Sequence, residues 1–171
     1  TLLFSTLNNK ALIDELGKAW VNAYQESYSS EVPEALVKLQ LGQTDHAINL
    51  LEQSDWSSVR LGDRGYRFKR QILSNLCRTL YNNKDYHRLL YWATAWQLLD
   101  ERDVDAIAYN YEALRQTDGR RKEGREGLLD NFKKFPKNEY LQRFYVWALF
   151  DAGEVEQATE LAEKYLSPDW V

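Results

Sequence analysis

The sequence is poor in residues that make turns and covalent cross-links: it holds eight Gly, three Pro, one Cys and no Met. So few Gly and Pro leave little turn chemistry for the many hairpins of an all-β fold. Because Cys77 is the single cysteine, no internal disulfide can form. This favours a reducing compartment, hence the cytoplasm, although a periplasmic location stays open because periplasmic proteins can also lack disulfides. No apolar run approaches the ~18 residues needed to span a bilayer, so membrane insertion is not expected.

The chain also has no initiating Met, which predicts an excised or processed piece of a longer protein. Its net charge of −4 and pI near 5.3 argue against a general binder of nucleic acid or of anionic membranes. Hydrophobic residues, by contrast, are abundant at 44%, and six Trp and eleven Tyr are among them. This composition is sufficient for a sizeable core and argues against disorder.

Apolar residues recur at helical spacing through most of the sequence, which predicts nine helices and no strand. We therefore expect one all-α domain over residues 1–171. Its predicted parts are an N-terminal helix within 1–28 and antiparallel helix pairs at 28–54, 66–103, 104–137 and 138–168. Residues 54–65 are rich in Ser, Asp and Gly and predict an exposed inserted loop, with Trp56 folding back against a helix.

Two glycines mark a repeat in the second half of the chain. Gly119 and Gly153 lie 34 residues apart, each at the end of an apolar periodic segment. Each is followed five residues later by a small residue, Gly124 and Ala158. A fixed period in this range is typical of stacked helical repeats. We expect the small residues to lie where two paired helices touch.

The first helix pair has the same pattern, and the second departs from it. Gly42 and Ala47 repeat it near the front of the chain. In the second pair, Lys84 stands where the other turns have glycine, and Leu89 occupies the small-residue position.

This arrangement resembles the tetratricopeptide repeat family, whose unit is a 34-residue helix–turn–helix with small residues at the helix contact. Pro136 falls where that family often closes the second helix. The resemblance covers roughly residues 28–168. It implies an antiparallel helix-pair solenoid, coiled as a right-handed superhelix. It further implies a scaffold within a bacterial-type assembly, signalling or envelope protein.

The resemblance also implies a partner-binding concave face, formed by the first helix of each pair. The residues it assigns to this face are Asn75, Arg78, Tyr81, Tyr109, Asn110, Tyr140, Arg143, Trp147 and Phe150. Asn75 and Asn110 stand where carboxylate-clamp members place backbone-binding asparagines, or they merely decorate a solvated helix. Gln71 stands where such a clamp has a lysine, so capture of a free C-terminal carboxylate is not expected.

The segment after Asn138 is unusually aromatic. Tyr140, Phe144, Tyr145, Trp147 and Phe150 exceed what one amphipathic stripe can bury. They predict either an interface rich in Tyr and Trp or a last repeat that packs through both faces.

Other candidate sites favour simpler interpretations. The stretch GRRKEGREG at 119–127 lacks the Lys-Ser/Thr ending of a phosphate loop and predicts an ordinary turn followed by a solvated helix start. His46 and His87 are expected at the surface, without metal-ligand spacing. Cys77 lies on an apolar helical stripe and is expected to be inert in the core. No nucleophile motif is present, so neither an enzyme nor a metal or other cofactor is expected.

The sequence therefore predicts a non-enzymatic interaction scaffold that binds a partner protein or an extended peptide. The alternative is a structural module whose aromatic last repeat makes a homodimer within a larger protein.

Overall fold

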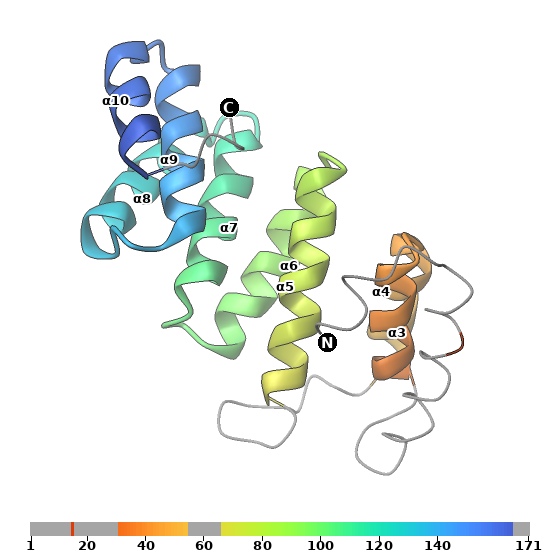
Figure 1. The fold of residues 1–171 in the computed structure, drawn as a ribbon. Helices are drawn as coiled ribbons and strands as arrows, with labels where there is room; N and C mark the ends of the chain where they lie inside the picture. The colour runs from red at the N-terminus through yellow and green to blue at the C-terminus, as the bar shows by residue number, and fades with distance from the viewer. Residues whose placement is uncertain (1–14, 16–30, 55–65, 166–171) are drawn as a thin grey trace. The chain divides into compact units, whose positions relative to one another are not determined.

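The computed structural model describes residues 15, 31–54 and 66–165 (Figure 1). Across these residues it contains eight helices and no strand, which confirms the all-α prediction for them. The predicted N-terminal helix, residues 55–65 of the predicted loop and Trp56 lie outside the described residues. The chain divides into two compact units, Thr1–Thr79 and Leu80–Val171, and each is described by itself.

The first unit contains a helical hairpin and most of a longer helix. α3 (Glu31–Gln40) packs against α4 (Thr44–Gln53), and buried aliphatic side chains from both form the contact. α5 (Tyr66–Asn82) follows, and its stripe of Ile72, Leu73, Leu76 and Cys77 is fully buried.

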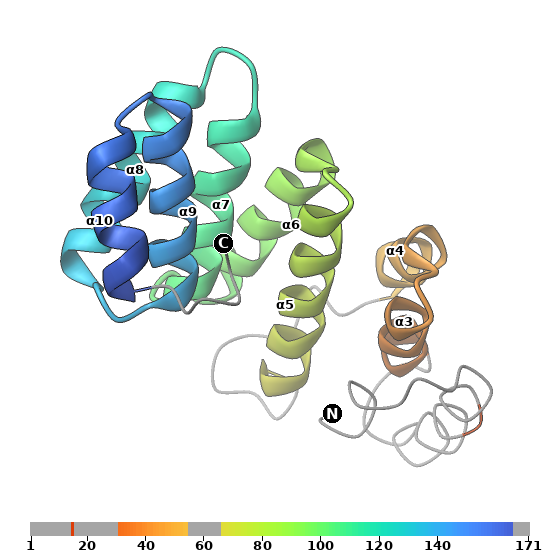
Figure 2. The same ribbon diagram turned by 45° about the horizontal axis from the view of Figure 1, so that its top comes forward.

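The second unit contains the last residues of α5 and five more helices. These are α6 (Tyr86–Leu99), α7 (Val104–Gln116), α8 (Arg121–Lys134), α9 (Glu139–Asp151) and α10 (Val155–Tyr165). Each helix packs against the next one along the chain, and α7 also packs against α9. Figures 1 and 2 both show α7 to α10 side by side in one group.

Three helices of the second unit have polar N-cap side chains. The carboxylate of Asp85 accepts the main-chain N–H of Arg88 at 3.2 Å. Asp103 and Asn138 cap α7 and α9 in the same manner. Each cap satisfies an N–H group that has no partner within its own helix, which typically stabilises the helix by ~1 kcal/mol.

Three hairpin turns share one hydrogen-bonding pattern. Gly42, Lys84 and Gly153 adopt positive φ angles of 75°, 59° and 80°. In each turn the following N–H reaches back five residues, as in Asp85 to the carbonyl of Leu80 at 2.9 Å. This double-bonded helix end requires a left-handed residue, which glycine adopts without strain. Lys84 adopts the same conformation although it carries a side chain.

The turn at Gly119 is built differently, although its φ of 77° matches the other glycines. α7 ends at Gln116, and Thr117 occupies the capping position. The N–H of Arg120 then bonds the carbonyl of Thr117 at 3.1 Å. The regular 34-residue spacing of Gly119 and Gly153 therefore conceals two different turns.

Small residues lie at the helix contacts, as predicted. Gly124, Ala47 and Ala158 are all buried, the two alanines completely. A Cβ placed on Gly124 would come within 2.6 Å of the Cα of Arg115 and 2.7 Å of the carbonyl oxygen of Tyr111. Both are main-chain atoms of α7, so only glycine permits α7 and α8 to approach this closely.

Two apolar residues that continue the helical spacing of their segments are exposed. Phe135 is 41% exposed because it caps the end of α8, where φ and ψ leave the helical region and the apolar stripe no longer applies. Val155 is 53% exposed, since it opens α10 one turn before Ala158, the buried contact residue of that helix. Periodicity alone predicts both of them incorrectly.

Candidate partner-binding site

A cluster of aromatic rings joins three helices of the second unit. Tyr81 at the end of α5 lies 5.1 Å from Phe144 of α9, measured between ring centroids. Tyr109 of α7 lies 5.2 Å from Phe144 and 4.9 Å from Tyr140. Phe144 is completely buried and Tyr109 is 2% exposed, whereas Tyr81 and Tyr140 are half-buried. The rings therefore form a packed base with two partly accessible edges.

One face of α9 remains accessible above this base. Tyr140, Arg143, Trp147 and Phe150 are spaced so that they follow one side of the helix, and we call them the α9 stripe. All four are half-buried or exposed, and Trp147 is 45% exposed. The rings of Trp147 and Phe150 touch at a centroid distance of 5.8 Å. Three aromatic rings and a guanidinium thus share a single helix face.

A buried ion pair lies in α7, between the ring base and the end of α9. Arg115 donates from Nε and Nη2 to the two carboxylate oxygens of Glu112, each at 2.7 Å. Its Nη1 also bonds Asp151 of α9, and Gln116 donates to Glu112 at 3.0 Å. Glu112 is completely buried, so this network satisfies a carboxylate that water cannot reach.

Burial governs the ionisation of the groups beside this network. It raises the pKa of Tyr81 to about 12, and the nearby carboxylate of Glu112 adds to the effect. Burial also raises the pKa of Glu112, against the lowering influence of the hydrogen bonds from Arg115 and Gln116. At neutral pH the Tyr81 hydroxyl is therefore protonated and able to donate.

The remaining residues predicted for the site lie in other surroundings. Asn75 and Arg78 belong to the first unit, where Arg78 Nη2 donates to the Asn75 side-chain oxygen at 2.8 Å. Asn75 is only 7% exposed. Asn110 donates from Nδ2 to the hydroxyl of Thr94 on α6 at 3.0 Å. Both asparagine amides thus form contacts within the fold.

The aromatic residues between positions 140 and 150 lie in two different environments. Phe144 and Tyr145 are buried, and Tyr145 stacks on Phe132 of α8 at 5.3 Å. Trp147 and Phe150 lie on the accessible face instead. The helix therefore packs through two faces and still presents aromatic surface on a third.

Residues 119–127 form a turn and the start of α8, in agreement with the ordinary-turn prediction. Their charges are locally compensated. Arg120 pairs with Glu123 at 2.8 Å, and Arg125 approaches Glu154 at 3.4 Å.

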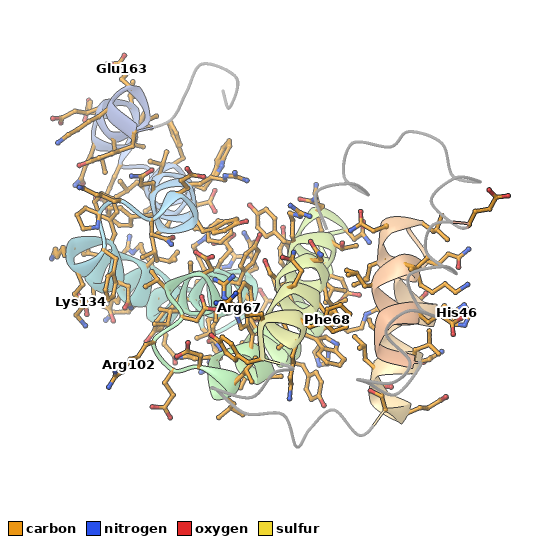
Figure 3. The ribbon with its side chains drawn as sticks, turned by 60° about the horizontal axis from the view of Figure 1, so that its bottom comes forward. His46, Arg67, Phe68, Arg102, Lys134 and Glu163 are labelled. Carbon is orange, nitrogen blue, oxygen red and sulfur yellow. The ribbon has the colours of Figure 1, made fainter. Side chains whose placement is uncertain are left out.

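The histidines and the cysteine were the other candidate residues. Within the described part of the chain, no group of three or more His, Cys, Asp or Glu side chains is placed to hold a metal ion. His46 and His87 are exposed, and Figure 3 shows His46 at the outer surface. Cys77 is buried in the core, as predicted, and burial raises the pKa of its thiol. No helix over residues 31–54 and 66–165 is long and apolar enough to cross a membrane.

Glu112 and Arg115 were not predicted as notable residues. Their separation of three residues on a helix is a signal for an ion pair, but the sequence does not reveal that the pair is buried.

No family model, no curated protein and no solved structure matches the chain.

Proposed function

We propose that this chain is a non-enzymatic interaction scaffold of the tetratricopeptide-like kind, which binds an extended peptide or a partner protein through the α9 stripe. The observation that carries the proposal is the 45% exposure of Trp147 beside Phe150 on an otherwise well-packed helix. Exposed Trp and Tyr side chains flanked by Arg are the residues that dominate interface energies.

The repeat architecture is part of the proposal. Hairpins α7–α8 and α9–α10 succeed one another along the chain and contact each other through α7, α8 and α9. Each has a small buried residue at its internal contact, Gly124 and Ala158, five residues after its turn glycine. These features support helix pairs stacked as a right-handed superhelix, with α7 and α9 on the concave face.

The rigid base beneath the α9 stripe favours binding. Tyr140 rests on Tyr109, which is held between Trp96 of α6 and Phe144. Side chains already fixed by packing lose little conformational entropy when a partner binds, so more of the contact energy appears as affinity. Arg143 would supply the charged contact, because a guanidinium can pair with an acidic side chain of the partner in a bidentate manner.

The test is a peptide selection followed by titration. A random peptide library is selected on the immobilised chain, and the recovered peptides are titrated calorimetrically against the chain and its variants. Trp147→Ala and Arg143→Ala are each expected to weaken binding by roughly 1 kcal/mol or more. Tyr91→Ala is the matched control, since Tyr91 is a 62% exposed aromatic residue on α6.

Thermal melts accompany each titration, so that lost stability is not mistaken for lost contact. Peptides that bind both stripe variants with full affinity, with normal melts, would remove the site from α9.

A second function uses the same exposed ring pair. Trp147 and Phe150 could pair with their counterparts in a second copy, so that the chain serves as a homodimerisation module. Sedimentation velocity over a range of concentrations separates the two: a dimer that Trp147→Ala dissociates supports dimerisation, and a monomer at every concentration supports the scaffold.

A further inference from the structure

A small apolar hollow lies at the connection between α8 and α9. It has a volume of about 410 Å³ and is lined by Val104, Phe135, Pro136, Asn138 and the flanking Lys134 and Lys137. The ring of Phe135 contributes to its wall and is 41% exposed. We call it the Phe135 pocket. It lies at the loop before α9, apart from the accessible stripe on that helix.

Hydrogen bonds hold the loop that forms the pocket. The N–H of Phe135 bonds the carbonyl of Asn131 at 2.8 Å, and the N–H of Asn138 bonds the carbonyl of Phe135 at 3.0 Å. Gln142 Nε2 donates to the carbonyl of Pro136 at 2.7 Å. Pro136 also restricts the backbone, so the main chain that carries Phe135 is well fixed.

The rim of this pocket is basic. Lys134 and Lys137 line it and Lys133 precedes them, and all three are exposed. Within the described residues, none of these ammonium groups forms an ion pair with a carboxylate. The nearest acid of α7, Asp105, already accepts a hydrogen bond from Asn138 Nδ2 at 2.7 Å. Figure 3 shows Lys134 directed away from the helices.

A second hollow, of about 460 Å³, provides a useful contrast. It is lined by Arg115, Arg121, Lys122 and Arg125 and would suggest an anion site by composition. Each of these cations, however, has a carboxylate within 3.8 Å, and Asp151 lies in the wall. Its cations are thus held in ion pairs, whereas the lysines of the Phe135 pocket form none with the described carboxylates.

We propose that the Phe135 pocket binds an acidic peptide segment of a partner protein, which inserts one apolar side chain against Phe135 and Pro136. Carboxylates flanking that side chain pair with Lys134 and Lys137. The local positive charge on a chain of net charge −4 selects such a segment over neutral ones. The volume of about 410 Å³ can take one inserted side chain of a peptide, and binding to an anionic membrane is the competing outcome that a vesicle experiment separates.

The probe is a fluorescein-labelled peptide with one Leu between two pairs of Glu, and its anisotropy is measured with the full chain. Two further peptides replace Leu by Ser or all Glu by Gln. The Glu–Leu peptide is expected to bind, and each replacement should weaken binding several-fold. The double variant Lys134→Gln with Lys137→Gln should weaken it roughly five- to thirty-fold, because each exposed charge contact contributes modestly. Phe135→Ser should cause a loss of about tenfold.

The matched control is Arg121→Gln with Lys122→Gln, which removes the same amount of charge at the other end of α8, about 18 Å from Lys134. It should retain binding. Equal losses in both double variants would mean non-specific attraction and overturn the proposal, as would no binding of the probe. Vesicles containing phosphatidylserine are a further arm: lysine-dependent binding to vesicles without binding of the peptide would reassign the surface to membranes. Circular dichroism confirms that each variant is folded.

Discussion

Arg115 encloses the completely buried carboxylate of Glu112 with two parallel hydrogen bonds of 2.7 Å each. Two residues of one helix thus satisfy each other inside the second unit, and Asp151 extends the contact to α9. Such a pair contributes little net stability when intact, because desolvation offsets the attraction, but losing one partner is costly.

Arg115→Ala should therefore destabilise the chain by about 3–5 kcal/mol, since it leaves an uncompensated buried carboxylate. The measurement is equilibrium denaturation in urea. Arg120→Ala is the control: its ion pair with Glu123 is exposed, so its loss should destabilise the chain far less than the loss of Arg115. Similar losses in the two variants would show that water reaches Glu112.

Among the residues that the structure describes, Lys84 is the one non-glycine residue with a positive φ angle, which is 59°. Left-handed backbone costs an L-residue ~1–2 kcal/mol, partly offset by the greater freedom of glycine in the unfolded chain. Lys84→Gly should therefore stabilise the chain by roughly 0.5–1 kcal/mol in the same urea experiment. Asn83→Gly is the control. It increases the conformational freedom of the unfolded chain but relieves no backbone strain, because the φ angle of Asn83 is not positive, so it should be neutral or destabilising. A loss of stability in Lys84→Gly would show that its side chain has a role in the turn.

Asp85 both caps α6 and pairs with Arg88, whose Nε lies 2.5 Å from its Oδ2. Partial burial acts to raise the pKa of Asp85, but the hydrogen bonds and charge of Arg88 outweigh it, and the pKa falls below 3.8. A lowered pKa contributes stability above the unfolded-state value, and this contribution disappears as pH falls through the folded-state value.

Asp85→Ala should accordingly cost ~0.5–2 kcal/mol at neutral pH, and the difference from the parent chain should shrink below about pH 3.8. Denaturation at several pH values measures both. Asp118→Ala, at a fully exposed side chain, is the control. A difference that persists unchanged in acid would assign the effect to helix propensity instead of charge.

The positions of the helices in the second half of the chain, and the ends of most of them, follow from local sequence patterns. Helical periodicity depends on which residues are apolar, and a cap or turn depends on neighbours only a few positions away. This is why Gly153 and Lys84 could both be placed at turns.

The contacts of these residues, by contrast, depend on how the helices pack. Trp147 and Tyr145 lie two positions apart on one aromatic helix, yet one is 45% exposed and the other is stacked on α8. Tyr109, predicted for the binding face, is part of the buried base, and the apolar residue Phe135 lies in the wall of a surface pocket. Burial depends on helices distant in sequence, so no local pattern contains it, and the same holds for the pairing of Glu112 with Arg115 out of reach of water.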